Sequence, residues 1–215
     1  MIGIFGGRFD PVHRAHVAVA QAAADQLNLK EVLWMVSAHA VHKSATANAA
    51  HRLAMVELAL EDLNDPRMRV DDREVQAAER GEDNPSYKTL EALQRERPKE
   101  EWVWILGEDQ LAAFTTWQRW EWLTQHMALA VCERAGEWKT KKSKTIPPEL
   151  TAAGARVFPI DFEADAVSSS QVRESIARGQ PIHGLVPPSV ADYVSAHAVY
   201  GGSEAAKAAQ CRNSV

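Results

Sequence analysis

Hydrophobic residues follow two different spacings along this chain. Short apolar runs, each typical of a buried strand, occur at residues 2–5, 32–36, 102–106, 127–131 and 156–160. The helical spacing of three or four residues is found at Val17, Ala20, Ala24 and Leu27, and again within residues 53–63 and 87–97. Residues 69–75 have the pattern of a more polar strand. Strands and helices therefore alternate along almost the whole chain.

This alternation predicts an α/β fold. We expect a single domain, spanning residues 1–200, with a Rossmann-like, doubly wound and mostly parallel sheet that has helices on both faces. Residues 201–215 are rich in Gly, Ala, Ser and charged residues without apolar periodicity, so we expect a disordered C-terminal tail there. In sheets of this kind, ligands bind beyond the carboxyl ends of the strands.

Composition limits the classes of partner. A net charge of -5 argues against a nucleic-acid partner, because such proteins usually carry a basic surface, but a few local donors suffice for a small phosphorylated substrate. Cys132 and Cys211 lack metal-ligand spacing and cannot form a disulfide framework, so we expect reduced thiols in a cytoplasmic protein. We also expect no signal peptide and no membrane partner. A homo-oligomer is left open.

The strongest chemical signal follows the first strand. Gly6 and Gly7 allow the backbone to approach phosphate, because they have no Cβ atom. The following helix offers free N–H groups and a positive dipole end. His13 and His16 are three residues apart and project from the same helical face. The segment predicts a polyphosphate cradle with two imidazole donors; the alternative is simply a polar start to a helix.

Two further segments place polar residues at the same edge of the sheet. Ser168, Ser169 and Ser170 precede a helix whose first N–H groups they can cap, and Arg173 follows one turn later; the alternative is a capped helix with a surface arginine. After the strand at residues 102–106, Gly107 and the acids Glu108 and Asp109 could accept hydrogen bonds from ribose hydroxyls. Trp117 offers a flat face for a pyridine ring, or belongs to the core.

These segments resemble motifs of a known enzyme family. Residues 6–16 resemble the GGxFDPxHxGH signature of nucleotidyltransferases related to nicotinate mononucleotide adenylyltransferase. Residues 168–173 are similar to the family's ISSTxIR motif, which holds the ATP phosphates. Residues 104–117 resemble its IIGxDxLxxFxxW pattern, in which Gly and Asp contact ribose and Trp stacks on the nicotinate ring. The resemblance extends from residue 1 to about residue 200.

Some positions depart from the family's motifs. Ala15 stands where the family usually has Gly, and Arg8 stands where it usually has a small hydroxylated residue. The side chain of Arg8 could reach a phosphate or point to solvent. Lys43 and Arg52 match the end of the family's PPHK loop and the arginine after it, although residues 37–41 lack the usual prolines. Both cations would suit the mononucleotide phosphate; a charged loop facing water is the alternative. The segment with Ser86 and Tyr87 is two residues shorter than the family's PSYTxxTL, which helps to hold the pyridine carboxylate.

The resemblance implies adenylyl transfer from ATP to nicotinate mononucleotide, giving deamido-NAD and pyrophosphate in NAD biosynthesis, with Mg²⁺ accompanying ATP. The implied catalytic residues are His13, His16 and Arg173. The implied ATP-binding residues are Gly6, Gly7, Arg8, Phe9, His13, His16, Ser168, Ser169, Ser170 and Arg173. The implied mononucleotide-binding residues are Lys43, Arg52, Ser86, Tyr87, Gly107, Asp109 and Trp117.

Other functions remain as alternatives. The enzyme could prefer nicotinamide mononucleotide, because the shortened segment at Ser86 concerns the pyridine substituent. Phosphopantetheine-type adenylyltransferases share the histidine motif but tend to be shorter and lack the GxD…FxxW block. Residues 13–16 resemble the HIGH motif of class I aminoacyl-tRNA synthetases, and residues 141–144 faintly resemble their KMSKS motif. The acidic net charge and the short chain argue against such an enzyme. A nucleotide sensor without activity would be expected to lose the paired histidines.

Overall fold

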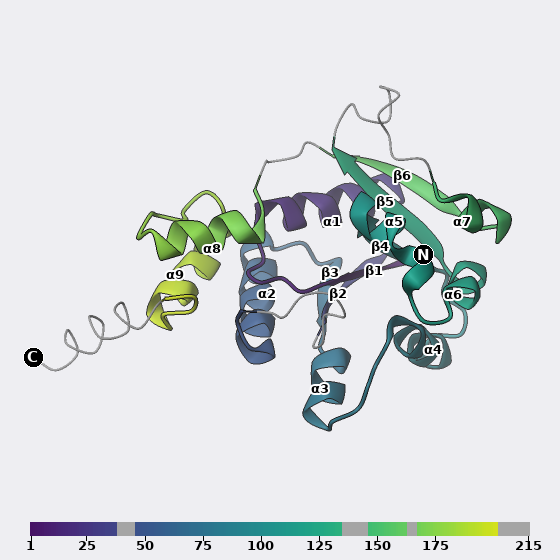
Figure 1. Cartoon of the computed structure of the whole chain (residues 1–215), viewed down its shortest axis with the longest axis horizontal. Coiled ribbons are helices and arrows are strands. Elements are labelled where there is room, and N and C mark those ends of the chain that lie inside the picture. Colours follow the sequence, from purple (N-terminus) through teal and green to yellow (C-terminus); the bar gives the residue numbers. More distant parts are fainter. Residues whose placement is uncertain (38–45, 135–145, 163–166, 202–215) are drawn as a thin grey trace, which may run out of the picture.

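The computed structural model of the chain describes residues 1–37, 46–134, 146–162 and 167–201 (Figure 1). Its strands are β1 (Ile2–Gly7), β2 (Glu31–Val36), β3 (Met68–Asp71), β4 (Trp102–Gly107), β5 (Ala128–Arg134) and β6 (Val157–Phe162). Its helices are α1 (Arg14–Gln26), α2 (Ala49–Leu63), α3 (Arg73–Glu79), α4 (Ser86–Glu96), α5 (Glu108–Ala112), η1 (Phe114–Thr116), α6 (Trp120–His126), α7 (Pro148–Ala152), α8 (Ser169–Ala177) and α9 (Pro188–Ala196). Lys43 and residues 202–215 of the predicted tail lie outside the described residues.

The strands form one parallel sheet in the order β3-β2-β1-β4-β5-β6. Ile4 of β1 lies between Leu33 of β2 and Trp104 of β4. The chain builds the sheet outward from β1 in one direction and then from β4 in the other. This reversal produces a topological switch point between β1 and β4, where doubly wound sheets bind nucleotides. The predicted fold is confirmed, and every pair of neighbouring strands is parallel.

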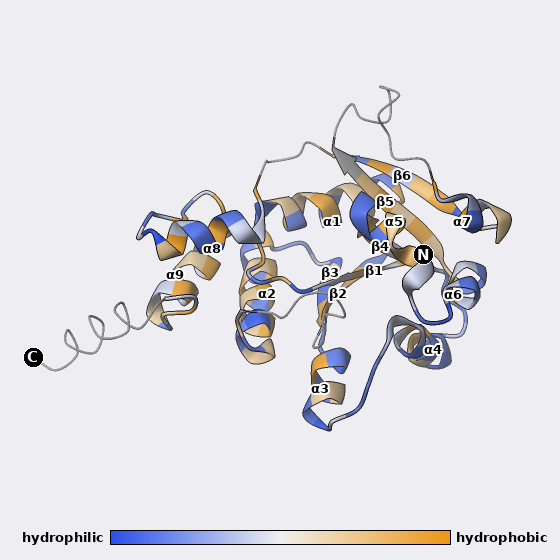
Figure 2. Cartoon of the chain, in the orientation of Figure 1, coloured by the Kyte–Doolittle hydropathy of each residue, from blue (hydrophilic) through white to orange (hydrophobic). Residues whose placement is uncertain are grey.

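Helices cover both faces of the sheet. One hydrophobic cluster joins the sheet to α1, α2, α8 and α9, and a second joins the opposite face to α4, α5, α6 and α7. Within β4, Val103 and Ile105 belong to the first cluster, whereas Trp104 and Leu106 belong to the second. Strands buried on both faces need apolar residues at successive positions, which is why they appear as continuous runs. Figure 2 shows this on β5, which is drawn largely in hydrophobic colours.

The predicted polar strand at residues 69–75 is only partly correct. β3 ends at Asp71, and α3 starts two residues later at Arg73. The Asp71 carboxylate accepts hydrogen bonds from both the main-chain N–H and the Nε of Arg73, at 3.1 and 2.8 Å. This local side-chain bond turns the chain out of the strand direction. The short helix that follows buries Val75 and Ala77 against the sheet region.

The C-terminal part of the described chain returns toward the start of the sequence. Figure 1 shows α8 and α9 together at one end of the molecule, beside α1 and α2. Val190, Ala191 and Val194 of α9 belong to the same cluster as Met55 and Val56 of α2. Pro188 begins α9 at a position where a missing N–H costs nothing. This packing brings residues close to 200 near the loop that follows β1.

Candidate active site

The loop after β1 ends at a pair of stacked histidines. His13 is the N-cap residue of α1, and its main-chain N–H donates to Nδ1 of His16 at 3.2 Å. The two imidazole rings stack with their centroids 3.7 Å apart. The helical spacing therefore brings both rings together, as the sequence predicts. His13 is buried and His16 is partly exposed.

Both imidazoles are held in the neutral form. Burial lowers the pKa of His13 from 6.5 to about 4. Burial, with a smaller effect from His13, holds the pKa of His16 well below 6.5. Because Nδ1 of His16 accepts a hydrogen bond, its proton lies on Nε2. His16 can thus donate from Nε2 while carrying no charge.

Aromatic packing explains the two glycines at the end of β1. A Cβ atom at Gly7 would lie 2.9 Å from Cζ of Phe9, and one at Gly6 would lie 3.2 Å from Cζ2 of Trp104. The ring of Phe9 is buried and meets the ring of His16 edge to face at 5.1 Å. The side chain of Phe9 therefore packs against His16 from the interior of the protein. Sequence reasoning attributed the glycines to phosphate approach and did not detect this packing.

The start of α8 docks onto the same loop. Ser168 caps the helix by a reciprocal pair of bonds with Gln171, whose main-chain N–H donates to Ser168 Oγ at 3.3 Å. Ser169 Oγ donates to the carbonyl of Pro11 at 2.9 Å. Arg173 donates from Nη1 to the carbonyl of Asp10 at 2.6 Å, and from Nη2 to Ser170 Oγ at 3.3 Å. The structure thus places the serine segment and Arg173 against the loop that carries His13.

Asp10 connects these segments, and sequence reasoning assigned it no role. Its side chain is only 1% exposed, and it accepts hydrogen bonds from the main-chain N–H groups of Thr46 and Ala47 at 2.8 and 3.1 Å. Burial alone would raise the pKa of Asp10, but these bonds and one from Tyr200 hold it below its ordinary value of 3.8. The Phe9-Asp10-Pro11 segment was the available signal, but the partners of Asp10 lie 36, 37 and 190 residues away in sequence.

Arg52 lies inside the protein rather than on an open phosphate site. It is 1% exposed, and its guanidinium donates to the carbonyls of Ala47, Arg8 and Ser37 at 3.2, 2.7 and 2.8 Å. These bonds tie the loop after β1 to the end of β2 and to the start of α2. The sequence predicts that Arg52 binds the mononucleotide, and the structure places its guanidinium inside the protein on three main-chain carbonyls.

The carboxyl end of β4 carries the remaining predicted residues. The N–H of Gly107 donates to Oε1 of Gln110 at 3.3 Å, and Asp109 lies in the first turn of α5. Trp117 is partly exposed, with its ring edge-on to Trp104 at 5.5 Å and tilted against Phe114 at 4.9 Å. One side of Trp117 therefore packs on the core, which leaves part of the indole open to a ligand.

Ser86 and Tyr87 form the first turn of α4 and are both partly buried. The main-chain N–H groups of Lys88 and Thr89 already donate to the carbonyl of Pro85, at 2.8 and 3.4 Å. The N–H groups of Ser86 and Tyr87 precede the first intrahelical bond, so a helix leaves them for other acceptors. The guanidinium of Arg119 lies 4.9 Å from the centroid of the Tyr87 ring.

Comparison with known proteins places this arrangement in a family. The model of the cytidylyltransferase-like family matches residues 4–175. A protein of Bordetella petrii named "Probable nicotinate-nucleotide adenylyltransferase" is 38% identical over 200 residues, which are 93% of this chain and 98% of that protein. A relative of the same name in Shewanella pealeana is 34% identical over 221 residues, 96% of this chain and 98% of its own. The chain belongs to the nicotinate-nucleotide adenylyltransferase family. It is therefore an enzyme, a nucleotidyltransferase.

Solved structures of this family share the fold. The nicotinic acid mononucleotide adenylyltransferase of Plasmodium falciparum, complexed with NaAD, superposes with a TM-score of 0.70. It is 21% identical, and the match covers 93% of this chain and 96% of that one. The same enzyme complexed with APC also gives a TM-score of 0.70, at 20% identity. At these identities the likeness shows that the two proteins share a fold.

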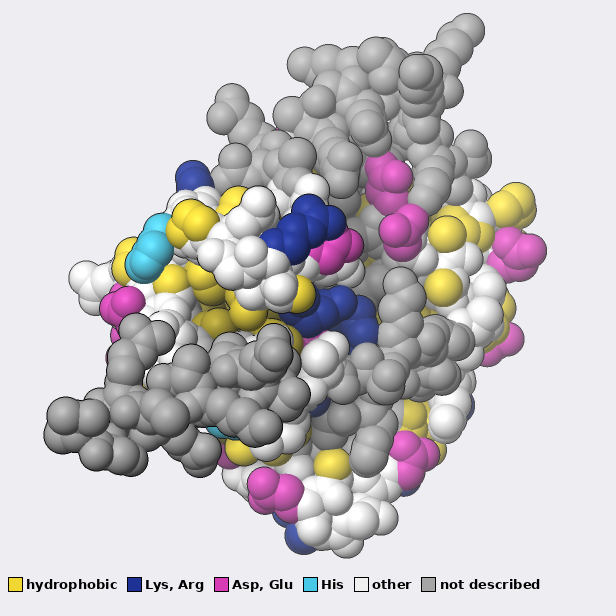
Figure 3. Space-filling view, turned by 60° about the vertical axis from the view of Figure 1, so that its left-hand side comes forward, with side chains coloured by type: hydrophobic (Ala, Val, Ile, Leu, Met, Phe, Trp, Pro, Cys, Tyr) yellow, Lys and Arg dark blue, Asp and Glu magenta, His cyan; other side chains and the backbone are white. Residues whose placement is uncertain are grey.

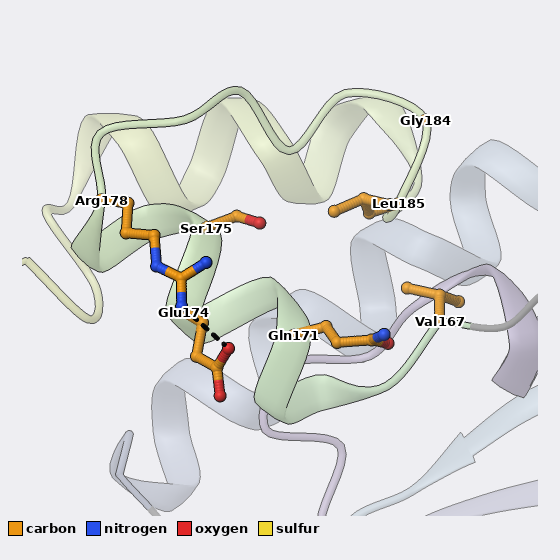
Figure 4. A pocket seen from close by; sticks show the side chains of 7 residues that line it. All are labelled: Val167, Gln171, Glu174, Ser175, Arg178, Gly184 and Leu185. Atoms are coloured by element: carbon orange, nitrogen blue, oxygen red, sulfur yellow. Dashed lines mark ion pairs between the residues drawn. The ribbon is translucent and has the colours of Figure 1, made fainter.

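A separate pocket lies on the other face of α8. It has a volume of about 490 Å³, and its lining comes from Val167, Gln171, Glu174, Ser175, Arg178, Gly184 and Leu185 (Figure 4). Arg178 and Glu174 form an ion pair across its rim at 3.5 Å. Ser169 and Arg173, which the sequence predicts to bind ATP, do not line this pocket; they contact Pro11 and Asp10 in the loop after β1 instead. Figure 3 shows this end of the molecule, with Lys and Arg side chains in a hollow beside hydrophobic surface.

Two absences concern only the described residues. Within residues 1–37, 46–134, 146–162 and 167–201, no helix is long and apolar enough to cross a membrane. The same part of the chain holds no group of three or more His, Cys, Asp and Glu residues arranged to bind a metal ion.

Proposed function

We propose that the protein transfers the AMP group of ATP to nicotinate mononucleotide, forming deamido-NAD and pyrophosphate. The observation that carries the proposal is the neutral, stacked pair of His13 and His16 at the start of α1, together with the anchoring of Arg173 to Asp10 in the loop that leads to them. The names of relatives that match 93% or more of the chain support the same reaction. The position of this group at the switch point of the sheet fits nucleotide binding.

The residues support catalysis by positioning and charge stabilisation. A phosphate oxygen of the mononucleotide attacks the α-phosphorus of ATP in line, and pyrophosphate leaves, so no enzyme nucleophile is needed. His16 would donate from Nε2 to a phosphate oxygen as negative charge develops, with His13 beside it. Arg173, Ser168, Ser169 and Ser170 would hold the β- and γ-phosphates. Gly6, Gly7, Arg8 and Phe9 would line the cradle with their main chain.

The described residues around this site fit Mg²⁺ only as an ion that enters bound to ATP. Asp10, the buried acid of the loop, has its carboxylate occupied by hydrogen bonds, and no protein metal cluster occurs in the described part of the chain. We therefore propose that Mg²⁺ is held by the phosphates and water, as this cation prefers, and supplies neutralisation of phosphate charge. The protein's own task is to hold the phosphates with imidazole, hydroxyl and guanidinium donors.

The mononucleotide would occupy the side of the site between β1 and β4. We assign its ribose to Gly107 and Asp109, its ring to Trp117, and its phosphate to Lys43 with Arg52 shaping the site behind it. The open N–H groups of Ser86 and Tyr87, at the positive end of α4, favour a carboxylate over an amide. This supports nicotinate rather than nicotinamide mononucleotide as the substrate.

An assay with both mononucleotides tests the proposal. The protein is incubated with ATP, Mg²⁺ and either nicotinate or nicotinamide mononucleotide, and the dinucleotide and pyrophosphate are quantified. We expect a preference for the acid of about tenfold to a thousandfold in kcat/KM, corresponding to about 1.4–4 kcal/mol. Equal or better use of the amide would reassign the substrate to nicotinamide mononucleotide. Failure to form either dinucleotide, with correctly folded protein, would refute adenylyl transfer to pyridine mononucleotides.

A further inference from the structure

The C-terminal end of the described chain reaches into the active-site loop. Tyr200 and Asp10 are 190 residues apart in sequence, yet the hydroxyl of Tyr200 donates to Oδ1 of Asp10 at 2.8 Å. Tyr200 is partly buried and packs against the first hydrophobic cluster. Burial, and then its bond to Asp10, raises the pKa of the Tyr200 hydroxyl, so it remains a protonated donor throughout the working pH range. No step of the proposed reaction uses this hydroxyl.

The carboxylate that Tyr200 contacts links both halves of the site. On the ATP side, Nη1 of Arg173 donates to the main-chain carbonyl of Asp10 and lies 3.9 Å from its Oδ2. On the mononucleotide side, the same carboxylate holds the N–H groups of Thr46 and Ala47, and Ala47 in turn accepts from Arg52. The position of the Asp10 carboxylate therefore affects a phosphate-binding guanidinium and the main chain leading into α2.

Tyr200 determines how strongly that carboxylate competes for Arg173. Three neutral donors, from Thr46, Ala47 and Tyr200, now share the negative charge of Asp10. Without the hydroxyl, the buried carboxylate would be short of one donor, and the nearest remaining charge that could compensate is the guanidinium 3.9 Å away. A tighter ion pair would draw Arg173 away from the phosphates.

We propose that Tyr200 is a positioning residue for adenylyl transfer: through Asp10 it keeps Arg173 available to the polyphosphate of ATP. The inference rests on the proposed function for its substrate, but it concerns a residue that makes no contact with the reacting atoms. It predicts that the functional boundary of the C-terminus lies between Val199 and Tyr200, with residues 201–215 dispensable for activity.

The chain offers a matched control for the loss of this hydroxyl. Tyr193 also has a partly buried ring and a hydroxyl that contacts a side chain, Nδ1 of His51 at 2.9 Å, but it lies on α9 away from Asp10. Tyr193→Phe and Tyr200→Phe each remove one hydroxyl and keep the ring. Both variants are compared with the wild type for melting temperature, for affinity toward an ATP analogue with a methylene bridge between the α- and β-phosphates, and for steady-state kinetics.

We expect Tyr200→Phe to weaken binding of the analogue and to raise the KM for ATP by about tenfold, the scale of one charged hydrogen bond. The effect on kcat should be smaller, and Tyr193→Phe should leave both constants unchanged even if its melting temperature falls equally. In an Asp10→Asn background, Tyr200→Phe should have little further effect, because the charge that the hydroxyl satisfies is gone.

Wild-type affinity and KM in Tyr200→Phe would overturn the inference, as would equal losses in both tyrosine variants. Should Asp10→Asn fail to fold, truncation after residue 200 and truncation after residue 199 provide the second comparison. Only the longer of these two should retain wild-type affinity for the analogue. An inactive wild-type enzyme that still binds the analogue tightly would refute the proposed function, while the binding comparison would still test Tyr200.

Discussion

Binding of the polyphosphate should be linked to uptake of a proton by the histidine pair. In the free protein burial lowers the pKa of His13 from 6.5 to about 4, which penalises its charged form by about 3 kcal/mol. A bound polyphosphate brings negative charge that favours imidazolium and opposes this penalty. If binding restores an ordinary pKa of about 6.5, the affinity gained by protonation is about tenfold at pH 5.5 and negligible at pH 7.5.

The variant that isolates this effect is His13→Asn. Asparagine is a favoured N-cap residue, so the start of α1 should persist while the titrating group is removed. Calorimetric titration with the methylene-bridged ATP analogue, at both pH values and in buffers of different ionisation enthalpy, gives the affinity and the number of protons taken up. The analogue's own phosphates titrate in both proteins, so only the difference between wild type and variant is interpreted.

We expect the wild type to gain about tenfold in affinity relative to His13→Asn when the pH falls from about 7.5 to about 5.5, and to take up about one more proton than the variant on binding at pH 5.5. An identical pH dependence in the two proteins would show that His13 stays neutral against the phosphates. The reasoning from burial to proton linkage would then be wrong, and the imidazoles would act only as neutral donors.

Three other predictions follow from the site and from α3. His16→Ala should lower kcat by about two to four decades with little change in the mononucleotide KM, and near wild-type kcat would contradict its role. Arg173→Ala should weaken ATP binding by about 1.5–3 kcal/mol, whereas equal weakening of both substrates would reassign it. Burial raises the pKa of Glu74 from 4.5 to about 7, so wild-type stability should fall as the pH rises through this range. Denaturant unfolding measures this: between about pH 5 and pH 8, the free energy of unfolding of Glu74→Gln should fall by up to about 3 kcal/mol less than that of the wild type, and an identical pH dependence in both proteins would refute this.

Most of the sheet could be predicted because its strands are buried on both sides. Residues 102–106 need apolar side chains toward two hydrophobic clusters at once, and that requirement is visible as an unbroken run. At β3 the same reasoning failed, because the strand has only four residues and the bond from Arg73 to Asp71 ends it. A turn fixed by the hydrogen bonds of one carboxylate leaves no periodic signal over seven residues.

The site shows a similar division. The pairing of His13 with His16 follows from helical spacing, and the capping by Ser168 follows from hydroxyl chemistry, so both were accessible from local sequence. The local sequence around Arg52 predicts a cation for the mononucleotide phosphate, whereas its burial and its three carbonyl partners are visible only in the tertiary structure. Whether a charge faces solvent or the interior depends on elements that lie far away in sequence.

The sequence by itself determined the parallel α/β fold, the helix that starts at the histidines and the chemistry available at the edge of the sheet. Those features depend on hydrophobic periodicity and on contacts within one turn of a helix. Only the tertiary structure decided that Asp10, Arg173 and Tyr200 meet, since they come from a loop, α8 and the end of the described chain. Their contact depends on how α8 and α9 pack against α1 and α2, and hydrogen bonds between segments more than 160 residues apart leave no pattern in either segment alone.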